Sequence, residues 1–328
     1  MIELLLPPIQ RGLLYGGVLL LAGVAGWRIF IAPGTAARLS PDGPGRTASI
    51  ERRMTGVGAV IALLLLPVWG LRLYTQLQDF RDPFAPLSED LSYLVFEAFW
   101  GTIWLVQGAL LVGLAAGFAL ARHRPPQEVP ARVPWGTVPP APPLPVRWKL
   151  LGLGVVSLAL TLALSSHAMS VPSNRPLAVA LDAAHVLAAG SWIGALSLIL
   201  VVRESLARPP EEPRSSLLAA QLQAFSPVAM VSVGVLLFAG FILSTQHVGT
   251  WENLWASQYG RTLLLKILVT LAVLLLGALN WRRGLPSLDT PEGHARTRRR
   301  AGLEVAAAVI VIAITAVLTG TPMPEGVH

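Results

Sequence analysis

Residues 177–200 read LAVALDAAHVLAAGSWIGALSLIL, an apolar stretch in which Asp182 and His185 are the only ionisable side chains. A helix rises about 1.5 Å per residue, so about 20 apolar residues cross the roughly 30 Å of hydrocarbon in a bilayer. This stretch, extended to 177–202, is therefore predicted to be a membrane-spanning helix.

Seven further stretches have the same apolar character. They cover residues 12–32, 54–77, 95–121, 149–168, 226–247, 260–281 and 302–320. Of the 328 residues, 53% are hydrophobic and 13% are charged, which is about half the charged share of a soluble protein. We predict an all-α fold: a polytopic membrane helix bundle of about eight transmembrane helices, surrounded by the lipid bilayer.

The basic side chains indicate how the bundle is oriented. Most of the 25 Lys and Arg residues follow spans one, three, five and seven, which marks that side as cytoplasmic under the positive-inside rule. The opposite side has only Arg11, Arg72, Arg81, Arg175 and Arg261. Both termini are therefore predicted to be extracytoplasmic. The net charge of +7 lies in these loops, so we expect no nucleic acid partner.

A proline-rich segment divides the chain. Residues 125–145 read PPQEVPARVPWGTVPPAPPLP, a composition that favours extended structure without a packed core. We predict a cytoplasmic linker over 122–147, which separates a three-span unit, 1–121, from a five-span unit, 148–328.

Polar residues inside the spans are the candidate functional residues, because an ionisable group in hydrocarbon costs a few kcal/mol (roughly 2.5–3.5 on insertion scales) unless it has a partner. Asp182, His185 and Trp192 share one stripe of span five. A carboxylate three residues before a histidine can accept one ring proton and leave the other nitrogen free for a metal. The alternative is a polar pair that only joins helices.

Span four ends in Ser165-Ser166-His167-Ala168-Met169, and His247 lies at the same end of span six. The chain has no cysteine, so a soft metal would have to bind His and Met. Imidazole and thioether together suit copper, and we predict His167, His185, Met169 and His247 as ligands. His185 lies about 12 Å along its helix, so the sequence leaves open whether it shares one site with His167.

Span seven places Tyr259, Lys266 and Asn280 on one face that should point into the bundle. Lys266 either pairs with Asp182 or extends toward the membrane surface. The sequence contains no GxxxxGK[ST] loop, Gly-x-Ser-x-Gly elbow or His-Glu-x-x-His pair, and we expect a protein that is not an enzyme.

The motifs SSHAMS, LDAAHVLAAGSWIGAL, FSPVAMVSVGVLLFAGFI and YGRTLLLKILVTLAVLLLGALNWRR, in this order between residues 165 and 283, resemble the copper resistance protein D family of bacterial membrane proteins. The resemblance implies a multi-pass protein of the bacterial inner membrane. It also implies copper movement from the periplasm toward the cytoplasm, together with a periplasmic copper-binding partner of the copper resistance protein C type. The positions that match the family are His167, His185, Trp192, Tyr259, Gly260, Lys266 and Asn280.

We therefore expect a copper transport or copper resistance protein. Its predicted metal ligands are His167, His185, Met169 and His247, and its predicted supporting residues are Asp182, Lys266, Tyr259, Asn280 and Trp192. One alternative is a membrane b-type cytochrome, in which His167 and either His185 or His247 ligate haem. Another is a membrane scaffold that transports nothing.

Overall fold

The computed structural model describes residues 2–39, 43–123, 144–171, 174–202, 215–284, 287 and 290–324. All regular structure in these residues is helical. Eight helices are long and apolar enough to cross a membrane: Leu5–Arg38, Gly45–Phe80, Phe99–His123, Val146–Ala163, Arg175–Val201, Leu217–Val248, Gln258–Gly284 and Ala295–Leu318. The predicted all-α membrane bundle with eight spans is confirmed. Most of the predicted linker lies outside the described residues.

Several spans are built from more than one helical segment. Span one joins α1 (Ile2–Gly26), η1 (Trp27–Ile31) and α2 (Ala32–Arg38). Spans two to four are α3 (Gly43–Phe80), α5 (Phe99–His123) and α6 (Val146–Ala163), with α4 (Leu87–Ser92) and η2 (Tyr93–Glu97) before α5 and η3 (His167–Ser170) after α6. Span five joins α7 (Arg175–Ala189), η4 (Gly190–Gly194) and α8 (Ala195–Val201). Span six is α9 (Ser215–Val248), followed by α10 (Asn253–Ala256); span seven joins α11 (Gln258–Leu279) and η5 (Asn280–Gly284); span eight is α12 (Pro291–Leu318).

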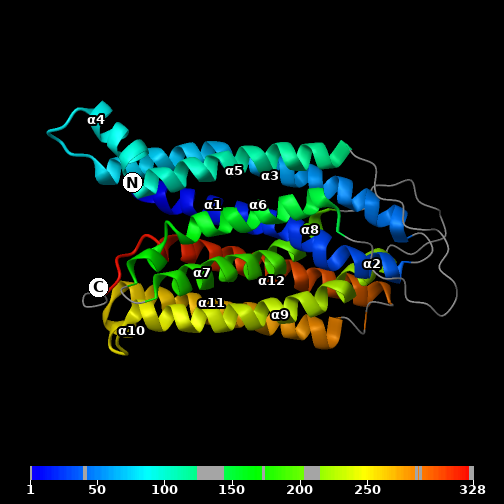
Figure 1. Ribbon diagram of the computed structural model, residues 1–328. Helices are drawn as coiled ribbons and strands as arrows, with labels where there is room; N and C mark the ends of the chain where they lie inside the picture. The colour runs from blue at the N-terminus through cyan, green and yellow to red at the C-terminus, as the bar shows by residue number, and fades with distance from the viewer. Residues whose placement is uncertain are drawn as a thin grey trace.

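The first turns of α1 and the last turns of α12 lie at the same end of the bundle (Figure 1). Gly12 of α1 faces Ala316 of α12 there. We call this the Arg-poor end, because it carries Arg11, Arg81, Arg175 and Arg261, and we call the opposite end the Arg-rich end. The positive-inside rule predicts that the Arg-rich end is cytoplasmic.

Helix α1 lies in the centre of the bundle and packs against α3, α6, α12 and η4. Its closest neighbour is η4, where Gly190 and Gly194 are four residues apart. A Cβ atom on Gly194 would collide with the carbonyl oxygen of Leu19, and one on Gly190 would collide with Ala22. Small residues at this spacing let two membrane helices touch along their backbones.

One hydrophobic core runs through both predicted units, since it contains Leu21 and Phe118 as well as Trp192 and Phe225. Polar contacts also cross the predicted boundary. The Arg72 guanidinium donates to Oε1 of Gln107 at 2.8 Å, and the Gln107 amide donates to Oγ1 of Thr161 at 3.2 Å. These bonds join α3, α5 and α6. The division into two units stays a prediction.

Span four is shorter than the predicted 149–168, because α6 ends at Ala163. The Ser165 hydroxyl donates to the carbonyl oxygens four and three residues back. The Ser166 hydroxyl donates to the carboxylate of Asp182. Ser166 also accepts the N–H of Ala168 and so caps η3. Serine at such a position replaces helical hydrogen bonds with its own, and the chain turns over the Arg-poor end of the bundle.

Candidate functional site

A cavity of about 420 Å³ lies in the Arg-poor half of the bundle, between α1, α7, α9, α11 and α12. Its lining is mostly apolar, with a few polar groups that come from different helices. Among the residues that line it are seven of the nine predicted site residues: His167, Asp182, His185, Trp192, His247, Tyr259 and Lys266. Asn280 and Met169 do not line it.

Three rings meet at the Arg-poor end of this cavity. The ring centroids of His167 and His247 are 6.1 Å apart, and Tyr259 lies 5.9 Å from His167 and 6.3 Å from His247. The rings come from η3, α9 and α11, so three separate parts of the chain build the cluster. We call these three residues the ring cluster.

Each histidine that lines the cavity has a buried ring nitrogen without a hydrogen-bond partner among the described residues. These atoms are Nε2 of His167, Nε2 of His247 and Nδ1 of His185. A buried polar atom without a partner costs about 1–3 kcal/mol. These three nitrogens belong to residues that line one cavity, where a bound ligand would satisfy them.

Tyr259 holds the ring of His247. Its hydroxyl oxygen lies 3.2 Å from Nδ1 of His247, and Tyr259 is only 3% exposed. When Nδ1 carries the proton and donates to this oxygen, Nε2 presents a free lone pair to the cavity. A ring that is fixed in this way by a second hydrogen bond is typical of histidine ligands of metals.

His167 stands in η3, beyond the end of span four. Burial is the main cause that lowers the pKa of His167 below 6.5, because the charged ring loses water. The ring is therefore neutral at pH 7. Only a neutral imidazole can offer Nε2 to a metal ion.

His185 lies deeper, three turns into α7, and its ring packs against Gly240 of α9. Within the part of the chain that the structure describes, no three His, Cys, Asp or Glu side chains are grouped closely enough to hold a metal ion. The three histidines thus face one cavity without forming one three-ligand group. His167 and His247 form the near pair, and His185 stands apart from them.

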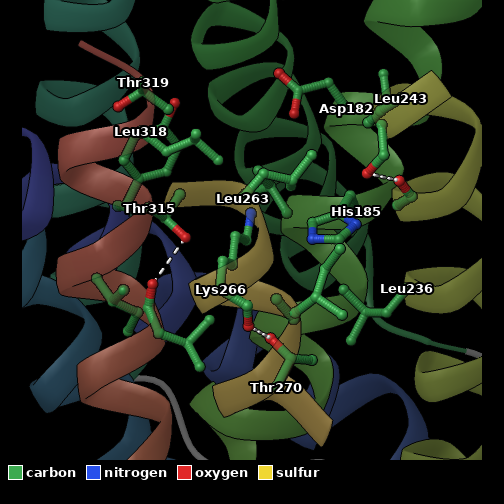
Figure 2. A pocket seen from close by; sticks show the side chains of 18 of the residues that line it. Asp182, His185, Leu236, Leu243, Leu263, Lys266, Thr270, Thr315, Leu318 and Thr319 are labelled. Carbon is green, nitrogen blue, oxygen red and sulfur yellow. Dashed lines mark hydrogen bonds between the residues drawn. The ribbon is translucent and has the colours of Figure 1, made fainter. Parts of the chain in front are cut away.

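The expected hydrogen bond between Asp182 and His185 is not found. The Asp182 carboxylate instead accepts the Ser166 hydroxyl at 2.7 Å, and Nδ1 of His185 stays without a partner. Figure 2 shows the carboxylate directed away from the His185 ring. The turn after α6 brings Ser166 over α7. The Ser166 hydroxyl therefore makes the hydrogen bond to Asp182 that the three-residue spacing had predicted for the His185 ring.

Lys266 extends from α11 into the cavity, opposite His185 on α7 (Figure 2). Among the described residues no ion pair joins it to Asp182. The cavity therefore contains one lysine amine and one aspartate carboxyl group, and no ion pair joins them.

The two methionines near this end occupy different places. Met169 packs against the small cluster that contains Ala163, Val179 and Leu243, away from the cavity lining. Met323, after the end of α12, packs against the cluster that contains Tyr259. The sequence favoured Met169 because it stands two residues from His167, but neither methionine lines the cavity.

A second cavity of about 300 Å³ lies toward the Arg-rich end, and its buried carboxylate was not among the predicted residues. Glu304 of α12 is 3% exposed and accepts the Trp192 indole N–H at 3.0 Å and the Asn280 amide N–H at 2.9 Å. The sequence signal was present, since Glu304 is the only acidic residue in the predicted span 302–320. Trp192 and Asn280, predicted as separate supporting residues, meet at this carboxylate.

Residues 219–318 match the family model of copper resistance protein D. The match contains His247, Tyr259, Lys266, Asn280 and Glu304, and it confirms the resemblance seen in the sequence. It begins after the motifs that contain His167, Asp182, His185 and Trp192, so these residues lie outside the match, and it extends beyond residue 283 to include α12. Together with the eight apolar helices it identifies a multi-pass membrane protein of the bacterial inner membrane.

The chain is also 26% identical over 324 residues to the copper transport protein CutJ of Bacillus subtilis (strain 168). The alignment covers 96% of this chain and 52% of that protein, so the chain spans about half the length of its relative. No solved structure matches the chain significantly.

Proposed function

We propose, from the match of residues 219–318 to the copper resistance protein D family, that this chain binds copper at the Arg-poor end and passes it into the bundle. Nε2 of His167 and Nε2 of His247 bind copper first, and Nδ1 of His185 receives it deeper in the cavity. The observation that carries this proposal is the set of three unpartnered imidazole nitrogens around one cavity.

The donor chemistry supports copper over harder cations. Imidazole nitrogen suits copper, and a two-nitrogen site does not need the carboxylates that Mg²⁺ or Ca²⁺ require. Met323 packs at this end of the bundle against the hydrophobic cluster of Val248, Tyr259, Leu263 and Leu318, and its thioether is of the kind that favours Cu(I).

The ring cluster argues against haem between His167 and His247. The centroid of Tyr259 is about as far from each histidine ring as those two rings are from each other. A porphyrin plane inserted between the histidines would extend into the space that Tyr259 fills. A single ion meets no such obstacle.

The charge asymmetry orients the bundle: if the Arg-rich end is cytoplasmic, the ring cluster faces the periplasm. The direction of copper movement, from the periplasm toward the cytoplasm, is taken from the resemblance to the copper resistance protein D family. A periplasmic copper-binding protein of the copper resistance protein C type would then deliver copper to His167 and His247. Both the direction and this partner are part of the proposal.

Copper content of the purified chain tests the proposal. After loading with copper and desalting, the wild type should retain the metal, and His167→Ala and His247→Ala should each lose most of it. His123→Ala is the matched control, because His123 is exposed at the last residue of α5 and does not line the cavity. Equal retention by all four proteins would reject the site, and a Soret band in the wild type would indicate haem instead.

A further inference from the structure

Glu304 is a buried carboxylate that the copper proposal does not use. Its side chain lies in the second cavity, which is lined by residues of η4, α8, α9, α11, η5 and α12. No other ionisable side chain among the described residues lines this cavity. Arg282 and Arg283 of η5 are exposed, and Arg300 is one turn earlier on α12 but does not line the cavity.

A carboxylate in such a place needs a cation. Removing an ionised carboxylate from water costs several kcal/mol, and two neutral N–H donors recover only part of that. The donors present are the indole of Trp192 and the amide of Asn280, and neither brings a positive charge. The pair Glu304 and Asn280 offers too few ligands for a metal ion, whereas a proton needs a single oxygen.

The amide of Asn280 suits both protonation states of Glu304. Its Nδ2 donates to the carboxylate, while its Oδ1 is buried without a hydrogen-bond partner. After rotation of the amide, Oδ1 can accept the O–H of a protonated carboxyl group. One side chain therefore satisfies the charged form and the neutral form in turn.

Trp192 connects Glu304 to the first cavity. Trp192 and Leu274 line both cavities, so the indole is part of the wall between them. Both donors come from π-helical turns: Trp192 lies in the middle of η4, and Asn280 begins η5. Such turns interrupt a helix at a cost and occur often at functional sites.

We propose that Glu304 is a proton-binding site that controls the Trp192 wall between the two cavities. As a carboxylate, Glu304 holds the indole N–H and keeps the wall closed. When it takes up a proton from the second cavity, the bond to Trp192 weakens and the indole is free to move. The proton returns to the cavity when the wall closes again, so no other group is consumed.

The statement that copper passes the Trp192 wall rests on the proposed function. Proton binding by Glu304 does not depend on that function. The test is therefore made without copper. Infrared difference spectra of the purified protein between low and neutral pH detect the C=O stretch of a protonated carboxyl group. We expect a pH-dependent band in the wild type that is absent in Glu304→Gln. Asp182→Asn, which removes the carboxylate of the first cavity, and His167→Ala, which tests copper binding, should both retain it.

A second variant keeps Glu304 and changes only its donor. Trp192→Phe removes the indole N–H that stabilises the charged form, so the midpoint of the band should move to higher pH by about one to two units. Trp281→Phe is the matched control, because Trp281 lines the same cavity and makes no hydrogen bond to Glu304. The proposal fails if Glu304→Gln leaves the band unchanged. It also fails if the Trp192→Phe midpoint equals that of Trp281→Phe, a result that can be obtained even where Glu304→Gln does not fold.

Discussion

Tyr259 and His247 belong to neighbouring helices, and the hydroxyl oxygen of Tyr259 lies 3.2 Å from Nδ1 of His247. The tyrosine is buried at the second residue of α11, and the histidine stands in the last turn of α9. This contact decides which nitrogen of His247 is free, and the first prediction follows from it.

Tyr259→Phe keeps the ring packing but removes the oxygen that fixes the His247 ring. Loss of such a supporting bond typically weakens metal binding by about 10–100-fold, and we expect a loss of that size in a copper titration. Tyr93→Phe is the control, because Tyr93 is exposed in η2 at the same end of the bundle. An unchanged affinity in Tyr259→Phe would mean that His247 is not a ligand.

Copper should stabilise the folded chain if it binds the ring cluster. A ligand present at a hundred times its dissociation constant adds about 2.7 kcal/mol to the free energy of unfolding. We expect copper to raise the melting temperature of the wild type, and a chelator to reverse the rise. The double variant H167A/H247A should melt at the same temperature with and without copper. A copper-dependent rise that persists in this variant would place the metal elsewhere.

Ser166→Ala should destabilise the chain by leaving the Asp182 carboxylate without its 2.7 Å donor. A hydrogen bond to a charged group contributes about 1.5–3 kcal/mol, and thermal unfolding in detergent measures the loss. Ser165→Ala provides the comparison, because the Ser165 hydroxyl donates to the carbonyl oxygen of Thr161 in the preceding helix α6 and not to Asp182. If both variants lose equally little, Asp182 is satisfied by other means.

Gly194→Ala tests the contact between η4 and α1. The added methyl group would collide with the carbonyl oxygen of Leu19, and the helices would have to separate. Overpacking of this kind costs typically about 1–3 kcal/mol or more, so we expect a lower melting temperature and a lower yield of folded protein. Gly234→Ala on α9 meets open space and should be neutral or slightly stabilising, since alanine favours helix over glycine by about 1 kcal/mol. Equal behaviour of the two variants would show that α1 and η4 are not in close contact.

The eight spans could be predicted because hydrocarbon imposes both length and composition on a membrane helix. The exact end of span four could not, since two serine hydroxyls stop α6 before the apolar residues end. Likewise, His167 and His247 could be assigned to one end of the bundle, but their meeting with Tyr259 depends on how η3 folds over α9 and α11.

Two site residues show why spacing alone is insufficient. Asp182 and His185 stand three residues apart on one helix, yet the Asp182 carboxylate accepts its hydrogen bond from Ser166, in the preceding turn, and not from His185. Glu304 is the only acidic residue in the predicted span 302–320, but it stands near the arginines at the start of α12 and was not predicted as a site residue. Its hydrogen bonds could not be predicted from the sequence, because they form only when spans five and seven bring Trp192 and Asn280 beside it.

The central place of α1 has a consequence for biogenesis. Ribosomes make α1 long before η4 and α12, although these later segments supply much of its packing surface. After α1 leaves the translocon, the surface that packs against η4 and α12 stays exposed to lipid until those two segments are inserted. Contacts so distant along the chain are slow to form. Packing around α1 is therefore incomplete until α12 is inserted, and synthesis that stops before α12 leaves both α1 and α11 without one of their packing partners.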